Sequence, residues 1–131
     1  MTKQLLAVRI NSDASPITEI DLNANGDTLG ALQEVVGGWV QAVDLQGKFA
    51  GFTLWVNEEG KFGGLSFNEI ATAVWEMSFG RNTDYIMGNA VITAGVDNEG
   101  DTMTLTAEQT AYLATCLTEA SKFSESQDFF S

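Results

Sequence analysis

The stretch WVQAVDLQGKFAGFTLWV, residues 39–56, decides the fold. It holds two apolar runs, residues 39–45 and 49–56, which are rich in aromatic and branched side chains and are joined by the polar connection Gln46-Gly47-Lys48. Two such runs around a short glycine-containing connection predict a β-hairpin, because the turn lets the second run fold back antiparallel to the first. We expect these two strands to lie at the centre of a sheet.

Further strands are predicted on both sides of this hairpin. Residues 3–10 and 17–22 alternate apolar and polar side chains with a period of two, which is typical of strands that bury one face. Pro16, the one proline of the chain, marks the loop between them. After the hairpin, residues 84–94 predict a long strand and residues 103–105 a short one.

Three helices are predicted, each from apolar residues that recur at helical spacing. Leu29, Leu32 and Val36 recur at helical spacing, and the run stops at Gly37-Gly38, where a glycine can adopt the left-handed conformation that closes a helix. Asp27 or Thr28 can cap the start of this helix. The third helix opens on the capping signature Thr106-Ala107-Glu108-Gln109 and then places four residues on one face: Leu113, Cys116, Leu117 and Ala120.

The second helix is the best specified of the three. Ser66-Phe67-Asn68-Glu69 fits a capping box, in which the Ser and the Glu each satisfy a backbone N–H of the first turn. Trp75 lies at the margin of the apolar stripe, and two interpretations stay open: partial burial against the core, or an exposed anchor for a partner. The stripe itself is expected at Phe67, Ile70, Ala71, Val74 and Met77 or Ser78.

These elements place the chain in the α+β class, as a single small domain with a mostly antiparallel sheet and about three helices. The domain is expected over residues 1–121, and an acidic, Phe-containing tail over residues 122–131. Phe129 and Phe130 are candidates to anchor this tail on the core, on a second copy or on another protein. Cys116 is the one cysteine, so no disulfide is expected within the chain, and its apolar neighbours predict a buried thiol.

Charge is the strongest constraint on function. The 131 residues include 18 Asp and Glu, 6 Lys and Arg and no His, which gives a formal net charge of -12. Nucleic acids are bound through clusters of Lys and Arg, so direct binding to nucleic acid is not expected, and neither is binding to an anionic membrane. A hydrophobic content of 44% excludes a disordered acidic chain. Because no apolar run approaches about 20 residues and no signal sequence is recognised, we expect a protein of the cytoplasm.

Motifs for catalysis are absent from the sequence. Without histidine there is no histidine general base and no histidine metal ligand, and the glycines form no P-loop. The paired carboxylates in Asn57-Glu58-Glu59-Gly60 could divide acid and base work, but the flanking Asn and Gly favour an ordinary turn with both carboxylates in solvent. We therefore expect no enzyme and no cofactor, with carboxylate-only catalysis as the remaining enzymatic alternative.

Residues 21–27, DLNANGD, match the first half of a calcium-binding loop. Asp21, Asn23 and Asn25 stand at alternate positions before Gly26, as oxygen ligands do in such a loop. The second half is missing, because Leu32 occupies the position of the bidentate Glu. We expect no metal site, and these three residues stay as the alternative set of ligands.

Three segments of the chain resemble one known family. They are LQEVVGGWVQAV at residues 32–43, WVNEEGK at residues 55–61 and IMGNAV at residues 86–91, with Leu65, Asn68 and Ala71 between the last two. Together they resemble the family named only as domain of unknown function 3846, over nearly the whole length of the chain. Its members are typically encoded by bacteriophages and bacterial mobile elements, so the resemblance implies a small accessory protein in the cytoplasm of a bacterial host. It implies no known chemistry.

The charge and the resemblance together predict a counter-defence inhibitor that acts by protein binding. Its acidic surface would occupy the basic nucleic-acid-binding site of a bacterial enzyme, with carboxylates in place of phosphates. In the second helix, Glu69 and Glu76 are expected to share a face. The plainer alternative is that the charges only keep a phage structural or regulatory protein soluble. The expected partner-binding residues are Glu19, Asp21, Asp44, Glu58, Glu59, Glu69, Glu76, Asp97, Glu99, Asp101, Phe129 and Phe130.

A second hypothesis is a small-molecule sponge that captures a nucleotide-like signal. The shortage of cations counts against it, because phosphates are usually met by Arg, Lys or a helix start. Asn68 also has a structural interpretation, since it can satisfy backbone groups at the start of the second helix. The pocket would combine aromatic walls with side-chain amides: Trp39, Trp55, Trp75, Asn57, Asn68 and Asn89.

Overall fold

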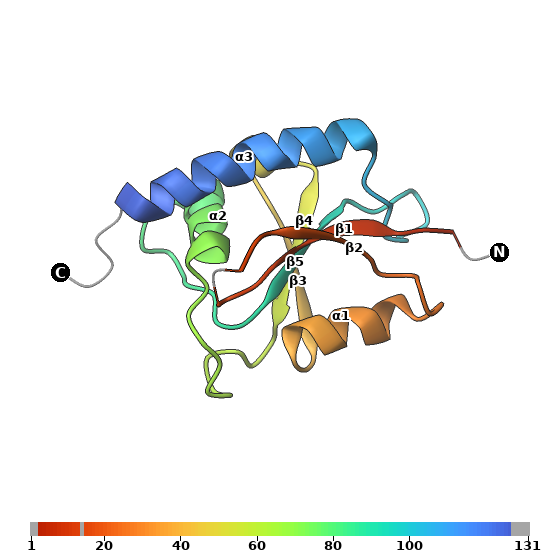
Figure 1. Cartoon of the computed structure of the whole chain (residues 1–131), viewed down its shortest axis with the longest axis horizontal. Coiled ribbons are helices and arrows are strands. Elements are labelled where there is room, and N and C mark those ends of the chain that lie inside the picture. The colour runs from red at the N-terminus through yellow and green to blue at the C-terminus, as the bar shows by residue number, and fades with distance from the viewer. Residues whose placement is uncertain (1–2, 14, 127–131) are drawn as a thin grey trace.

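The computed structural model of the chain describes residues 3–13 and 15–126. These residues form five strands and three α-helices: β1 (Leu6–Ile10), β2 (Thr18–Asp21), α1 (Thr28–Val36), β3 (Val40–Asp44), β4 (Phe52–Asn57), α2 (Glu69–Phe79), β5 (Ala90–Ala94) and α3 (Ala107–Ser126). The strands lie in the order β2-β1-β5-β4-β3, and each pairs antiparallel with its neighbours. The prediction of an α+β domain built on an antiparallel sheet is confirmed (Figure 1).

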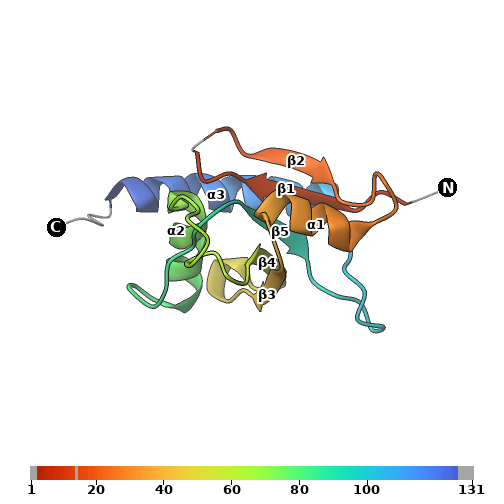
Figure 2. The same cartoon turned by 90° about the horizontal axis from the view of Figure 1, so that it is seen from below.

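Strand β5 holds the centre of the sheet, between β1 and β4. All of its residues are buried, because α1 covers one face of the sheet while α2 and α3 cover the other (Figure 1). The prediction that the hairpin is central is therefore wrong: β3 is an edge strand, and Figure 2 shows it at the opposite edge from β2. Because β5 is buried on both faces, its sequence has no alternation of polar and apolar residues. The sequence predicts that this segment is a strand, but it does not predict which strands lie beside it.

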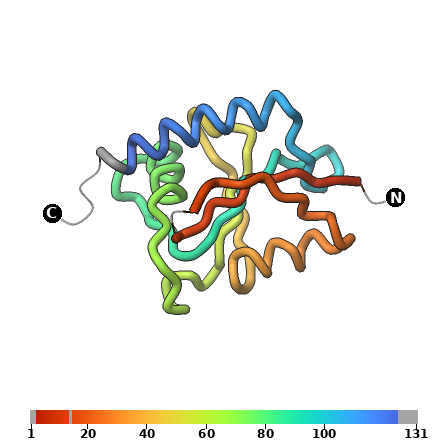
Figure 3. Tube along the Cα trace, viewed as in Figure 1, coloured from red at the N-terminus to blue at the C-terminus, as the bar shows by residue number. Residues whose placement is uncertain are grey.

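Two apolar clusters hold the layers together. Each large side chain buried in them contributes about 1.5–3 kcal/mol. Helices α2 and α3 lie side by side over the sheet, as the trace in Figure 3 shows, and the larger cluster fills the space beneath them with Ile10, Leu54, Val74, Ile92 and Leu113 among its members. The smaller cluster lies beneath α1 and contains the buried residues Ala7, Leu22, Leu32 and Val91. Cys116 is a free thiol buried in the larger cluster, as predicted.

Local capping signals place the ends of α1 and the start of α3. Asp27 caps α1, because its Oδ1 accepts a hydrogen bond from the Gly30 N–H at 2.9 Å. Gly37 ends the helix in the left-handed conformation, with φ 83°. At α3, the Thr106 Oγ1 accepts from the Gln109 N–H at 3.1 Å, and the Gln109 Oε1 accepts from the Thr106 N–H at 2.9 Å. These predictions are confirmed.

Helix α2 begins after Asn68 and not after Ser66, so the predicted capping box is wrong in its register. Asn68 is the N-cap, and its Oδ1 accepts from the Ala71 N–H at 3.0 Å. Phe67 pairs with Met87 in an isolated antiparallel bridge, which keeps the chain extended up to the cap. A long-range backbone contact therefore decides which of two capping residues is used.

Other element boundaries also differ from the prediction. The hairpin connection is the 3₁₀ turn Gly47–Phe49, so β4 starts at Phe52. The expected long strand is limited to β5, and in place of a strand at residues 103–105 there is a single bridge between Val96 and Thr102. Helix α3 continues to Ser126, so the first part of the expected tail is helical, and Phe129 and Phe130 lie outside the described residues. Within residues 3–13 and 15–126, no helix combines the length and the apolar character needed to cross a membrane.

Candidate functional site

Most of the predicted acidic residues lie at one or the other end of the sheet. Val40 pairs with Asn57, so the turn after β4 lies where β3 begins; we call this the β4 end, and it carries Glu58 and Glu59. Phe52 pairs with Ala94, so the turn after β5 lies at the opposite end, the β5 end. Strand register places five of the predicted acids there: Asp21, Asp44, Asp97, Glu99 and Asp101. Glu19 lies on the edge strand β2 and Glu69 in the first turn of α2.

Most of these carboxylates have no cationic partner in the described part of the chain. Among the residues that the structure describes there are two ion pairs, Lys48 with Glu119 at 2.5 Å and Lys61 with Asp84. Neither pair uses a carboxylate predicted to bind a partner. A carboxylate in solvent with no cation beside it keeps its long-range attraction for a basic surface. The predicted acids that are exposed are Glu19, Asp44, Glu58, Glu59, Glu69, Asp97, Glu99 and Asp101.

Glu76 does not belong to this exposed set, and its predicted place on an outward face is wrong. The side chain is only 6% exposed. The loop after α2 folds back over this part of the helix, and the Asn82 N–H donates to Glu76 Oε2 at 2.6 Å. Helical spacing from Glu69 predicts an outward position for Glu76, but it does not predict the loop after α2 that covers Glu76.

The residues of the calcium-like loop hold the chain together ahead of α1. Asp21 Oδ1 accepts from the backbone N–H groups of Leu5 and Asn23, each at 2.9 Å. The Asn23 Nδ2 donates to the Lys3 carbonyl at 2.7 Å, and Asn25 is exposed. In the described ranges, no three His, Cys, Asp or Glu side chains gather as they would around a metal ion. Asp21 and Asn23 therefore act as turn-forming residues in this structure.

The β4 end combines exposed acids with exposed aromatic rings. Trp39, just before β3, is 68% exposed, and Phe62, in the turn after β4, is 91% exposed. Both rings line a hollow of about 200 Å³ together with Glu59. Large exposed rings that lie close together are typical of protein-binding sites, because a partner that covers them removes their apolar area from water. We call Trp39, Glu58, Glu59 and Phe62 the acidic-aromatic surface.

Hydrogen bonds of the neighbouring backbone hold this surface in place. The Glu58 N–H donates to the Trp39 carbonyl at 2.8 Å, which ties the turn to the start of β3. Asn57 Oδ1 accepts from the Glu59 N–H at 2.8 Å, and Asn57 Nδ2 donates to the Val36 carbonyl at 3.1 Å, at the end of α1. The predicted turn at residues 57–60 is confirmed, and the acids and rings are anchored to β3, β4 and α1.

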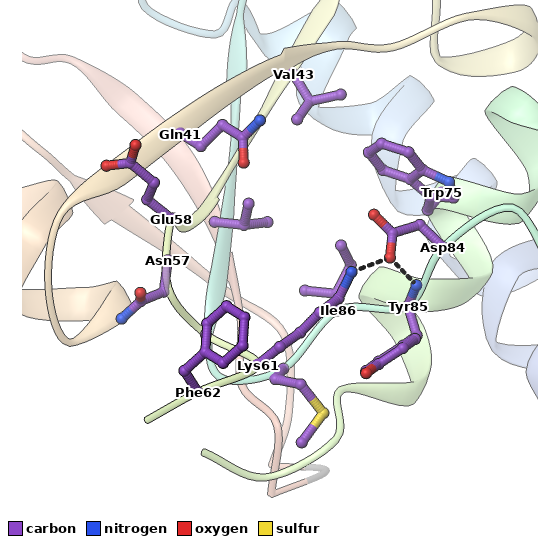
Figure 4. A pocket seen from close by; sticks show the side chains of 13 residues that line it. Gln41, Val43, Asn57, Glu58, Lys61, Phe62, Trp75, Asp84, Tyr85 and Ile86 are labelled. Carbon is purple, nitrogen blue, oxygen red and sulfur yellow. Dashed lines mark hydrogen bonds and ion pairs between the residues drawn. The ribbon is translucent and has the colours of Figure 1, made fainter. Parts of the chain in front are cut away.

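A second hollow, of about 110 Å³, adjoins the acidic-aromatic surface and is shown in Figure 4. Glu58 and Phe62 border it from the turn after β4, and Trp75 borders it from α2. Lys61 reaches across to Asp84, and its ammonium nitrogen lies 4.6 Å from the centre of the Tyr85 ring (Figure 4). Because Asp84 neutralises Lys61, the cation nearest to Glu58 and Glu59 in the chain does not cancel their charge.

Trp75 is half-buried against the core, as the first of its two interpretations predicts. Its Nε1 donates to Thr83 Oγ1 at 2.9 Å, and its ring lies 4.5 Å from that of Phe79 between centroids. The indole therefore fixes the loop after α2 and forms one wall of the hollow in Figure 4.

Asp84 predicts a pH dependence of stability. Burial opposes its ionised form, but hydrogen bonds from Lys61 and from the Tyr85 N–H outweigh burial and hold the pKa of Asp84 below its usual value of 3.8. Because the folded pKa is the lower one, this stabilisation is complete above the unfolded pKa and is lost as the pH falls through the folded pKa. We expect Asp84→Asn to lower the free energy of unfolding by about 0.5 kcal/mol near neutral pH.

Urea unfolding of the wild type and of Asp84→Asn at about pH 7 and about pH 2.5 measures this effect. The difference between the two proteins should shrink at the lower pH. A difference that is the same at both values would contradict the assignment to the ionised carboxylate.

The six residues of the predicted small-molecule pocket do not line one cavity. Trp55 faces α1, where its Nε1 donates to Thr93 Oγ1 at 2.9 Å. The Asn89 Nδ2 donates to the Val35 carbonyl at 3.3 Å, and its Oδ1 accepts from the Ser12 N–H at 3.0 Å. Asn57 borders both hollows of the β4 end, one with Trp39 and the other with Trp75.

Asn68 is completely buried and makes only structural contacts. Besides capping α2, its Nδ2 donates to the carbonyls of Ile10 at 3.0 Å and Gly88 at 2.9 Å. The structural interpretation of Asn68 is confirmed.

Sequence reasoning misses Phe62 and Tyr85 as site residues. Phe62 lies between Lys61 and two glycines, and an apolar ring where neither a helix nor a strand is predicted is the signal that points to exposure. The sequence predicts Tyr85 to lie within a strand over residues 84–94, which gives no sign of a site residue. The first part of this segment is irregular in the structure.

Comparison with known protein families gives a match over most of the chain. A family model described as Domain of unknown function (DUF3846) matches residues 3–118. No curated protein and no solved structure matches. The matched range contains all five strands, α1, α2 and every residue of the acidic-aromatic surface.

Proposed function

Because the chain belongs to the family described as Domain of unknown function (DUF3846), which brings no activity with it, we propose a function from the surface of the molecule. The protein acts by binding: it occupies the basic nucleic-acid-binding site of a bacterial enzyme and so inhibits that enzyme, as an accessory protein of a phage or mobile element. Its carboxylates take the place of phosphates, and the bound enzyme can no longer reach nucleic acid.

The acidic-aromatic surface carries this proposal. Glu58 and Glu59 are exposed and form no ion pair within residues 3–13 and 15–126, and they lie beside two rings that are 68% and 91% exposed. Unpaired carboxylates steer a basic partner toward the surface and raise the rate of association. Aromatic rings supply affinity once the surfaces meet, because rings buried at an interface are frequent hot spots. Solubility alone accounts for the acids, but it does not account for the two exposed rings beside them.

The net charge supports the same partner. With a formal charge of -12, the protein repels nucleic acid and other acidic proteins and attracts basic surfaces over about one Debye length. The acids of the β5 end and of β2 add to this attraction without forming part of the acidic-aromatic surface.

Affinity purification from a bacterial lysate tests the proposal. The full chain and a variant that carries Trp39→Ala, Glu58→Gln and Glu59→Gln serve as baits at about 50 mM and about 300 mM NaCl. The wild type is expected to retain a basic, nucleic-acid-binding protein at low salt, to lose it at high salt, and to retain far more of it than the variant. Equal recovery on both baits, or a retained protein that binds no nucleic acid, would overturn the proposal.

A further inference from the structure

A pocket of about 430 Å³ lies between α2 and the loop that follows it. It shares Asp84 and Tyr85 with the hollow of Figure 4, but no residue of the acidic-aromatic surface lines it. Its wall combines two carboxylates, two aromatic rings and several uncharged polar residues. The lining includes Phe67, Thr72, Glu76, Asn82, Asp84 and Tyr85.

Glu76 is the unusual member of this wall. The residue is only 6% exposed, and its Oε2 accepts a hydrogen bond from the Asn82 N–H at 2.6 Å. Its other oxygen, Oε1, is buried and has no hydrogen-bond donor in the described part of the chain. A buried carboxylate oxygen without a donor is unfavourable, because it has lost its water and gained nothing in exchange. Because Glu76 lines the pocket, a bound donor that reaches Oε1 would satisfy this oxygen.

Three other polar side chains of the pocket, Thr72, Thr83 and Asp84, already make hydrogen bonds. Thr72 Oγ1 accepts from the Ile86 N–H at 2.9 Å, and Thr83 Oγ1 accepts from Trp75 Nε1 and donates to the Gly80 carbonyl. Asp84 Oδ1 accepts from Lys61 and from the Tyr85 N–H. Glu76 Oε1 is the buried acceptor of this wall that lacks a donor among the described residues, so it favours a ligand that brings an N–H donor, and a positive charge strengthens the attraction to the carboxylates.

We propose that this pocket binds a guanidinium or primary ammonium group carried on a short alkyl stem. An N–H of the charged head donates to Glu76 Oε1, with Asp84 as the second carboxylate of the site. The rings of Phe67 and Tyr85 cover the methylene groups of the stem, and the Tyr85 ring already has a cation, Lys61, over its face. Arg81 is exposed and forms no ion pair among the described residues, so this cation of the chain does not occupy the site.

The charged group has two possible sources that share this chemistry, a free small amine or guanidine and the Lys or Arg side chain of a bound protein. The inference does not rest on the proposed function, because the pocket and the acidic-aromatic surface have no residue in common.

Amide chemical shifts of the full chain, titrated with n-propylguanidinium chloride, n-propylammonium chloride and the neutral analogue n-propylurea, test the site. The two cations should cause saturable shifts at the amides of Asn82 and Thr83, and n-propylurea should not. Glu76→Gln keeps the size of the side chain and its hydrogen bond from Asn82, and should weaken cation binding by about tenfold or more. Glu34→Gln removes the same charge from an exposed position on α1 and should leave binding unchanged.

Two results would overturn the inference. The first is equal binding of the cations and of n-propylurea by the native chain, a result that needs no variant. The second is unchanged cation binding by a folded Glu76→Gln variant. A capped Ala-Arg-Ala peptide separates the two sources. Tighter binding of the peptide than of n-propylguanidinium indicates a protein side chain, and weaker binding indicates a free small cation.

Discussion

Replacing Asn68 with alanine is expected to lower the free energy of unfolding by about 3 kcal/mol. The side chain is completely buried and joins three parts of the fold: α2 through the Ala71 N–H, β1 through the Ile10 carbonyl, and the segment before β5 through the Gly88 carbonyl. Alanine removes the cap of α2, which costs about 1 kcal/mol, and leaves two buried carbonyls without their donor.

Urea unfolding of Asn68→Ala, Asn68→Asp and a control measures this contribution. Asn68→Asp keeps the capping oxygen but places a second acceptor against the two carbonyls. It should therefore lower the free energy of unfolding by at least as much as Asn68→Ala. The control is Asn98→Ala, in the exposed turn of the β5 end, which should stay within about 0.5 kcal/mol of the wild type. If Asn68→Ala proved as stable as the control, the buried hydrogen bonds would not hold these elements together.

At the acidic-aromatic surface, Trp39→Ala is expected to weaken binding of the captured partner by about 30-fold, which corresponds to about 2 kcal/mol. Leu29→Ala is the matched control, because Leu29 is 54% exposed but lies on α1, away from the surface. The loss should appear mainly as faster dissociation, since an anchor acts after the surfaces have met.

The double variant Glu58→Gln and Glu59→Gln is expected to slow association and to reduce its salt dependence, with a smaller effect on dissociation. Its control is Glu34→Gln with Glu108→Gln, which removes the same charge from exposed positions on α1 and α3. Association rates measured at several salt concentrations distinguish steering by the acidic-aromatic surface from steering by net charge. If both double variants slow association equally, net charge and not the acidic-aromatic surface steers the partner.

Local signals in the sequence predict the helices well, and long-range contacts explain where they fail. Asp27, Gly37 and the pair Thr106 and Gln109 act within one turn of chain, so their capping roles are readable from the sequence. The start of α2 is not, because the bridge from Phe67 to Met87 joins residues far apart in the chain. The central place of β5 is likewise a property of the whole sheet, set by its pairing with β1 and β4.

The candidate site was predictable only in part, for the same reason. Exposure of Glu58 and Glu59 follows from the turn that Asn57 and Gly60 predict. The burial of Glu76 does not follow from helical spacing, because the loop that covers it is placed by its own contacts, among them the hydrogen bond from Trp75 to Thr83. The nearness of Trp39 to Phe62 depends on the pairing of β3 with β4.

Competition between this protein and nucleic acid for the captured partner tests the central claim most directly. Labelled double-stranded DNA or RNA, whichever the partner binds, is titrated with the full chain while its anisotropy is followed. The wild type is expected to displace the nucleic acid completely, and Trp39→Ala should require about 30-fold more protein. A ternary complex, in which the partner holds the nucleic acid and this protein together with undiminished affinity for both, would contradict the account.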